Sequence, residues 1–322
     1  MTITAARQAA SPDVRVDFTP PPVTIIIPSY NRVNYLLESI TSCLAQDYPH
    51  RRIVVTDDGS TDETVQMVQA LAEFGVELVQ GPHTGAPINR NRGLATVSSP
   101  YVVWIGDDDV LVHDVLSRRV DALRKFPTAD VIHGDTMICD AALEPKQLLQ
   151  GEDWSSRSDA LISTLFNRNV IADAGSLISM AVYARAGWYD PAFPKGHDYH
   201  LWSRAASRCT FRHDPNVGVL WRWHGSNMGL GGGANPYADA HRRIVLDMWT
   251  RFDKRLLFPG IDWNTLPEAQ HDAIGAVAMA ERLMVEDAWD DAFQFVTAAL
   301  ALGAGEHAQT LATQLAARLT DS

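Results

Sequence analysis

The feature that most limits the fold of this chain is a regular alternation of apolar runs with segments of helical spacing, beginning at residue 23. Val23 to Ile27 is a continuous run of β-branched residues, as expected of a strand buried on both faces. Such alternation predicts an α/β protein with a mostly parallel sheet and helices on both faces. Further strands are expected at 53–56, 76–79, 101–105 and 131–138, and helices at 35–46, 61–74, 91–97 and 115–126.

The second half of the chain departs from this alternation. Residues 150–235 have a mixed pattern, with short strands expected at 177–180 and 217–223 and a helix at 198–207. From residue 236 onward the spacing is helical, and three alanine-rich segments predict a set of antiparallel helices. These segments are residues 269–285, 287–302 and 307–319.

We therefore expect three parts along the chain. Residues 1–22 end in three prolines and have no signal-peptide core, which predicts a disordered lead-in. Residues 23–235 would form the α/β domain, and residues 236–322 a C-terminal helical region. The glycine-rich stretch 225–233 is expected to be a mobile lid or a disordered connector.

Composition and charge argue against several classes of protein. The chain has 322 residues and a net charge of -12, and it contains no run of Lys or Arg that would bind a nucleic acid. Its three cysteines are widely spaced, which fits neither a disulfide framework nor a zinc site. No apolar run approaches the roughly 20 residues that span a bilayer. These features predict a cytoplasmic protein with no transmembrane segment and no nucleic-acid partner.

Polar clusters follow three of the predicted strands at the points where the strands end. Ser29-Tyr30-Asn31 follows the first, Asp57-Asp58 the second, and Asp107 to Asp109 the fourth. Ligands in open sheets of this kind bind beyond the carboxyl ends of the strands. The three clusters are therefore expected to lie on one edge of the sheet, around a shared ligand site.

The run of three aspartates points to a divalent cation. Carboxylates this close repel one another, and a bound Mg²⁺ or Mn²⁺ relieves the repulsion while leaving positions for phosphate and water. Gly106 removes a side chain at the strand exit, so that backbone or ligand can approach closely. The alternative is a solvated acidic turn that caps the following helix.

Five segments, in this order, resemble the conserved motifs of glycosyltransferase family 2. The first is TIIIPSYNR from Thr24, the second VTDDGSTD from Val55, and the third RNRG from Arg90 leading into YVVWIGDDD from Tyr101. GHDYHLW from Gly196 and WRWHGSN from Trp221 follow. The resemblance implies a GT-A fold, a nucleotide-sugar donor, usually a uridine diphosphate sugar, and transfer with inversion. Residues 23–140 would then bind the nucleotide sugar and residues 141–235 the acceptor.

The resemblance also implies roles for residues at the donor. Pro28, Tyr30 and Asn31 would line the base pocket, with Tyr30 packed against the uracil. Asp57 would bond the base or ribose, and Arg90 would face the ribose or the phosphates. The family's Asp-x-Asp motif has Gly106 at its first position here, so a ribose contact would pass to Asp107. Asp109 follows the motif and would help to orient the site.

The remaining implied residues carry the chemistry. Asp108 falls on the metal-binding position, and His224 on a position that can reach the metal or the diphosphate. Asp198 falls on the general base that takes the proton from the acceptor hydroxyl. The residue that usually precedes it is Glu, and here it is His197. Mn²⁺ or Mg²⁺ would stabilise the leaving diphosphate.

Two rival interpretations remain open at the level of sequence. A nucleotidyltransferase would need a Gly-rich basic loop after the first strand, where this chain has Ser29-Tyr30-Asn31-Arg32. The second rival interpretation is a non-catalytic module that senses nucleotide sugars. It stays open because Gly106 and His197 depart from the family pattern. The chain lacks the Gln-x-x-Arg-Trp motif of processive synthases, which favours addition of a single sugar. The C-terminal helices could support a homodimer.

Overall fold

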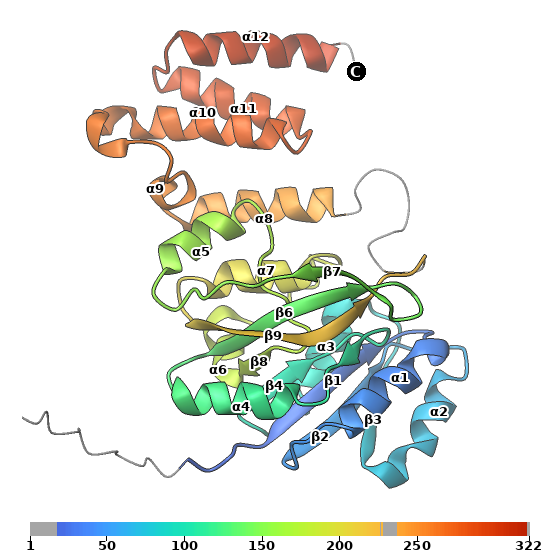
Figure 1. Cartoon of the computed structure of the whole chain (residues 1–322). Helices are drawn as coiled ribbons and strands as arrows, with labels where there is room; N and C mark the ends of the chain where they lie inside the picture. The colour runs from blue at the N-terminus through green and yellow to red at the C-terminus, as the bar shows by residue number, and fades with distance from the viewer. Residues whose placement is uncertain (1–17, 226, 228–236, 321–322) are drawn as a thin grey trace, which may run out of the picture.

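A computed structural model describes residues 18–225, 227 and 237–320. Most of the lead-in predicted over residues 1–22, and most of the predicted lid over 225–233, lie outside these described residues. Among the described residues, nine strands form one sheet in the order β3-β2-β1-β4-β8-β6-β9-β5, with β7 paired to β6 (Figure 1). The strands are β1 (Val23–Ser29), β2 (Arg51–Asp57), β3 (Val76–Gln80), β4 (Tyr101–Trp104), β5 (Val110–Leu111), β6 (Val131–Cys139), β7 (Pro145–Leu149), β8 (Leu177–Ser179) and β9 (Phe211–Arg222).

The two halves of the sheet differ in strand direction. Strands β3, β2, β1 and β4 are parallel to one another, as the alternating sequence pattern predicts. Strand β8 is antiparallel to both β4 and β6, and β5 and β7 add further antiparallel pairs. Strand β6 is parallel to β9. The α/β class is confirmed, and the sheet is parallel in its first half and mixed in its second.

The continuous apolar runs are explained by burial on both faces of the sheet. In β1, Ile25 and Ile27 pack into the core that contains α1, whereas Ile26 packs into the core on the opposite face. In β4, Trp104 joins Ile26 and Val103 joins Ile25. Because successive side chains of a strand point to opposite faces, a strand covered on both sides must be apolar at every position.

Helices cover both faces, and the last three form a separate layer at the top of Figure 1. Helix α3 begins five residues before the predicted start at 91, because Gly85 precedes it with φ 91° and Pro87 suits its first turn. The helices are α1 (Val33–Leu44), α2 (Thr64–Ala70), α3 (Ala86–Leu94), α4 (Val115–Lys125), α5 (Ser158–Leu165), α6 (Met180–Ala186), α7 (His197–Ala205), α8 (Ala238–Arg251), α9 (Lys254–Leu257), α10 (His271–Met284), α11 (Trp289–Ala301) and α12 (Glu306–Thr320), with short 3₁₀ turns at η1 (Ala72–Phe74), η2 (Trp263–Thr265) and η3 (Glu268–Gln270).

The C-terminal helices share a core with the second half of the sheet. Ile244 and Met248 of α8 belong to the same buried apolar cluster as Trp202 of α7, and so do Met279 of α10 and Val296 of α11. The cluster is therefore continuous from the sheet to the C-terminal layer. In the part of the chain that the structure describes, no helix is long and apolar enough to cross a membrane.

Candidate active site

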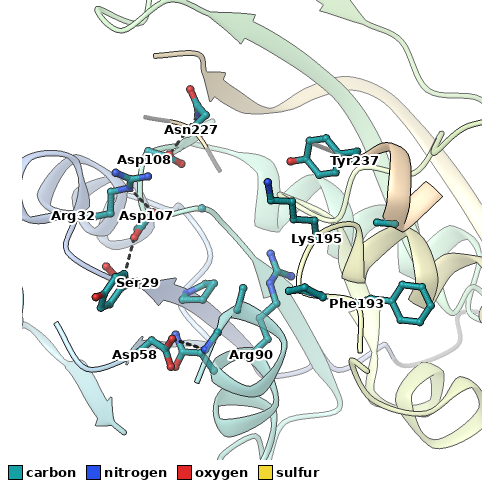
Figure 2. A pocket seen from close by; sticks show the side chains of 18 of the residues that line it. Ser29, Arg32, Asp58, Arg90, Asp107, Asp108, Phe193, Lys195, Asn227 and Tyr237 are labelled. Carbon is teal, nitrogen blue, oxygen red and sulfur yellow. Dashed lines mark hydrogen bonds and ion pairs between the residues drawn. The ribbon is translucent and has the colours of Figure 1, made fainter. Parts of the chain in front are cut away.

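A cavity of about 770 Å³, which we call cavity A, opens at the carboxyl ends of β1 and β4. Figure 2 shows Asp58, Asp107 and Asp108 on one side of it and Lys195 and Tyr237 on the other. The predicted residues Pro28, Tyr30, Arg90, Asp107 and Asp108 all line this cavity. The polar strand ends predicted to meet at one edge of the sheet thus do so.

The acidic turn after β4 is held by backbone contacts. Asp109 accepts a hydrogen bond from the backbone N–H of Arg222 at 2.9 Å, and Arg222 Nε donates to the carbonyl oxygen of Asp108 at 2.8 Å. A Cβ added at Gly106 would lie 2.6 Å from Asp109 Oδ2 and 3.0 Å from Asp108 Oδ1. A side chain at this position would therefore displace the carboxylates of Asp108 and Asp109 from their present positions over Gly106.

Crowding of these carboxylates changes their protonation. Burial, and then the charge of Asp108, raise the pKa of Asp107 to about 7. Burial and the same neighbour raise the pKa of Asp109 well above its usual range. Burial and repulsion between neighbouring carboxylates thus both favour the protonated forms of Asp107 and Asp109.

Asp108 lies beside His224, as predicted. The distance between Asp108 Oδ2 and His224 Nε2 is 3.1 Å, and the imidazole stacks on Tyr35 with ring centroids 4.7 Å apart. Within the described residues, no group of three or more His, Cys, Asp or Glu side chains is arranged to hold a metal ion. One carboxylate and one imidazole are too few to complete the shell of a divalent cation, so a Mg²⁺ or Mn²⁺ ion at this pair would need further oxygen ligands from substrate phosphates and water.

The predicted base pocket contains an aromatic stack. The ring of Tyr30 stacks on that of His83, with centroids 4.0 Å apart and an angle of 20° between planes. His83 Nδ1 lies 2.9 Å from Asp58 Oδ2, and Asp58 accepts a hydrogen bond from the backbone N–H of Gly85 at 2.8 Å. Asp58 lines cavity A, although it is 3% exposed and its carboxylate also accepts the backbone N–H of Thr84 at 3.1 Å.

Two residues predicted to contact the nucleotide-sugar donor, Asp57 and Asn31, have their side chains outside cavity A. Asp57 is buried with 1% of its surface exposed, and its carboxylate accepts the backbone N–H groups of Gly59 and Ser60, each at 3.1 Å. Asn31, with φ 52°, uses its side-chain oxygen to accept the backbone N–H of Thr61 at 2.8 Å. Asn31 joins the loop after β1 to the loop after β2, whereas Asp57 makes its contacts within the loop after β2. Neither side chain lines cavity A, and their base contacts stay predictions.

A second cavity of about 650 Å³, cavity B, contains Asp198. Asp198 lies in the first turn of α7, which follows Gly196 in a left-handed conformation with φ 64°. The two cavities share four lining residues, Arg90, Gly106, Trp221 and Tyr237. Asp108 and Asp198 therefore face two cavities that adjoin along a common wall.

Burial and neighbouring charges shift the pKa of the Asp198 carboxyl group. Burial raises its pKa to about 6, and Asp173 adds to this, whereas Arg90 opposes it. Asn169 Nδ2 donates a hydrogen bond to Asp198 Oδ2 at 3.0 Å. The adjacent His197, where the family usually has Glu, has its pKa lowered to about 3 by burial and then by Arg90. His197 is therefore neutral at pH 7, and the second carboxylate near Asp198 is that of Asp173.

Arg90 forms much of the wall between the cavities. Its guanidinium pairs with Asp173 and lies 3.2 Å from the Tyr189 hydroxyl. It also stacks over the ring of Trp104 at 4.7 Å. The sequence predicted that Arg90 would face the ribose or the phosphates. In the structure, Arg90 lines cavity A, but its guanidinium forms an ion pair with Asp173.

Comparison with known proteins identifies a family for the part of the chain that contains Asp107 and Asp108. Residues 24–181 match the model of the family described as Glycosyl transferase family 2. The chain belongs to glycosyltransferase family 2. This family 2 chain is 26% identical over 246 residues to an uncharacterized glycosyltransferase of Rickettsia prowazekii, covering 73% of each chain.

A second relative is much longer than this family 2 chain. An uncharacterized glycosyltransferase of Rickettsia felis is 27% identical over 208 residues, which are 63% of this chain and 34% of that one. The chain thus spans about a third of the length of that relative. The match covers one part of a larger protein, so the activity of the whole relative does not carry over by similarity alone.

Solved structures confirm the GT-A fold. A fragment of S. aureus TarS in complex with UDP-GlcNAc superposes with a TM-score of 0.62, at 16% identity, over 91% of this chain and 90% of that one. The mannosyltransferase PcManGT from Pyrobaculum calidifontis, in complex with GDP-Man and Mn²⁺, superposes with a TM-score of 0.53, at 20% identity, over 94% and 81%. At these identities the likeness concerns the fold.

The sequence interpretation missed residues on both sides of the site. Asp58 and His83 on the cavity A side, and Asn169 and Asp173 on the cavity B side, were given no role. Asp58 stands next to a predicted residue, and only the turn geometry decides which of the two carboxylates faces the cavity. Asn169 and Asp173 lie in an irregular loop, where periodicity carries no signal.

Proposed function

We propose that this protein transfers a single sugar from a nucleotide diphosphate sugar to an acceptor hydroxyl, with inversion at the anomeric carbon. The observation that carries the proposal is the common wall between cavity A, which contains Asp108, and cavity B, which contains Asp198. A donor in one cavity and an acceptor in the other would meet at that wall. Holding two reactants in line in this way supplies much of the catalytic effect in such reactions.

The proposed donor is a uridine diphosphate sugar bound in cavity A. Its base would pack against the stack of Tyr30 and His83, with Pro28 beside it and Asp58 in the place first given to Asp57. Asp107 would contact the ribose. The neighbours' ligands, UDP-GlcNAc and GDP-Man, are nucleotide diphosphate sugars and support this class of donor.

The proposed metal site consists of Asp108 and His224, with the donor diphosphate supplying further oxygen ligands. A bound Mn²⁺ or Mg²⁺ would stabilise the negative charge that builds on the leaving diphosphate. The residues of the chain orient that site. Arg222 fixes the backbone of Asp108, and Asn227 Nδ2 lies 3.5 Å from Asp108 Oδ2.

Asp198 is the proposed general base. With a pKa of about 6 it is mostly ionised at pH 7, yet close enough to that pH to accept a proton efficiently. One carboxylate on the acceptor side allows direct displacement by the acceptor hydroxyl, and this produces inversion. Cavity B would hold the acceptor, with Trp154 and Trp221 offering apolar faces and Arg168 and Asn169 offering polar groups. Cytoplasmic location and a homodimer through the C-terminal helices stay predictions.

The test compares two isosteric variants, Asp198→Asn and Asp108→Asn. We expect Asp198→Asn to bind UDP with Mn²⁺ as the unaltered protein does, and to lose about 10²–10⁴-fold in turnover, the range that a general base contributes. We expect Asp108→Asn to lose Mn²⁺-dependent UDP binding. Calorimetric titration with UDP and Mn²⁺, and UDP release from a panel of UDP-sugars, measure the two effects. Near-normal turnover in Asp198→Asn would remove Asp198 from the mechanism.

A further inference from the structure

The loop between α5 and β8 passes directly over the carboxylate of Asp198. Its residues 168–173 all line cavity B, and the side chain of Asn169 makes the one hydrogen bond between side chains that is recorded for Asp198 within the described residues. That bond joins Asn169 Nδ2 to Asp198 Oδ2 over 3.0 Å. The contact spans 29 residues of sequence, so it depends on how the loop and α7 pack together.

The orientation of the Asn169 amide is set by a second contact. Its Oδ1 accepts a hydrogen bond from the backbone N–H of Ile171 at 3.2 Å. An amide whose oxygen is occupied in this way turns its NH₂ group to the opposite side, and that group can only donate. Asn169 therefore presents a donor to Asp198, and a donor stabilises the ionised carboxylate over the protonated carboxyl.

We infer that Asn169 is a positioning residue, which favours the ionised form of Asp198 and, together with the backbone N–H groups of Tyr199 and Asp198, fixes the orientation of its carboxylate. This inference rests on the proposed function, in which Asp198 is the base. A carboxylate free to rotate would present its oxygens in many directions, whereas one held by several donors keeps a single orientation. Precise placement of the reacting groups is what such a contact supplies.

The charges around Asp198 show why a donor is needed there. Asp173, in the same loop, raises the pKa of Asp198, and the guanidinium of Arg90 from α3 lowers it. Tyr237, before α8, also lines cavity B, and the adjacent His197 is neutral. Arg90 is paired with Asp173, so much of its charge is already compensated. Asn169 adds a neutral hydrogen-bond donor, which favours the ionised carboxylate of Asp198 without neutralising its charge.

Two substitutions at one position separate this role from a purely structural one. Asn169→Ala removes both the donor to Asp198 and the acceptor for Ile171. Asn169→Asp keeps an oxygen that can accept from Ile171 but replaces the donor with a like charge beside Asp198. If Asn169 only shaped the loop, Asn169→Ala would leave the pKa of Asp198 unchanged, although the like charge in Asn169→Asp would still raise it. If Asn169 positions Asp198, the pKa rises in both variants, and more in Asn169→Asp.

The measurements are the pKa of Asp198, followed by ¹³C NMR of its carboxyl group, and the pH profile of kcat/KM for UDP release from UDP-sugars. We expect the Asp198 pKa and the acidic limb of the profile to rise by about half a pH unit in Asn169→Ala and by about one unit or more in Asn169→Asp. Affinity for UDP with Mn²⁺ should stay within about twofold in both. Asn167→Ala is the matched control, because its amide donates to the Ser163 carbonyl at 2.8 Å and not to Asp198.

The outcomes distinguish the two hypotheses. An unchanged Asp198 pKa in Asn169→Ala, whatever its value in Asn169→Asp, overturns the positioning role. A pKa that rises as expected while the kcat/KM profile stays in place supports the contact between Asn169 and Asp198 and removes Asp198 as the base. A rise in both quantities supports the inference together with the function on which it rests.

Discussion

The two cavities hold their carboxylates in different ways. At the strand end beside cavity A, two acids are anchored by backbone N–H groups: Asp57 by Gly59 and Ser60, and Asp58 by Thr84 and Gly85. On the cavity B side, Asp198 and Asp173 come from a helix start and an irregular loop, and they are held by the side chains of Asn169 and Arg90. Backbone anchoring would fix the proposed nucleotide site, whereas side-chain anchoring would let the proposed acceptor side vary without rebuilding the sheet.

The largest expected effect on stability comes from substituting Arg90 in the wall between the cavities. Arg90→Leu leaves the buried carboxylate of Asp173 without its partner, which typically costs about 3 kcal/mol or more in the free energy of unfolding. We also expect both UDP binding and turnover to fall, because Arg90 lines both cavities. Urea unfolding followed by circular dichroism measures the stability change. Arg168→Leu, at an exposed position of cavity B, is the control and should stay within about 0.5 kcal/mol.

If Arg90→Leu behaved like the Arg168 control, the two cavities would be independent units rather than two sides of one wall. The comparison between them would then lose its structural basis. Loss of turnover alone, with normal UDP binding and stability, would assign Arg90 to the acceptor side only.

A smaller effect is expected from the backbone-anchored acid Asp57. Asp57→Asn weakens two hydrogen bonds to backbone N–H groups in a buried loop, and we expect the free energy of unfolding to fall by about 2 kcal/mol. Because its carboxylate lies beneath cavity A, UDP affinity should change by no more than about twofold. Thermal unfolding and calorimetric titration with UDP measure the two quantities. A loss of UDP affinity without a loss of stability would restore the base contact first predicted for Asp57.

The smallest expected effect is a gain in stability, on substitution of Asp198. The pKa of Asp198 is raised from 3.8 to about 6, so the folded protein binds this proton more tightly than the unfolded chain does. The contribution of this carboxyl group to the free energy of unfolding is fully present below pH 3.8. It is lost as the pH rises through about 6, and it stays low above that pH. Asp198→Asn resembles the protonated form, so at pH 7 it should raise the free energy of unfolding by about 1 kcal/mol, allowing for partial solvent screening.

The same variant should show no gain at pH 4, where Asp198 is already protonated in the folded protein. Urea unfolding at pH 4 and pH 7 gives both values. A loss of stability at pH 7 would mean that Asp198 is anchored like Asp57, and the contrast between the two sides of the site would disappear.

The sequence predicted the first half of the fold well because strands buried on both faces must be apolar at every position. The same strands fixed where Asp107 and Asp108 lie, since a polar cluster after a buried strand falls at its carboxyl end. Strand β7 was missed because all five of its residues are exposed and show no alternation. The choice between Asp57 and Asp58 depends on loop hydrogen bonds, which no pattern of residue types records. Asn169 was missed for a related reason, since its partner lies in a distant helix.

The shared apolar cluster of α7, α8 and the C-terminal helices has a mechanical consequence. The helix that begins beside Asp198 packs through Trp202 against the interior that also contains Met248 and Met279. Close-packed interiors transmit small displacements rather than absorbing them. A displacement of the outer layer of α10 to α12 would therefore be transmitted through interlocked side chains to α7, the helix that carries Asp198.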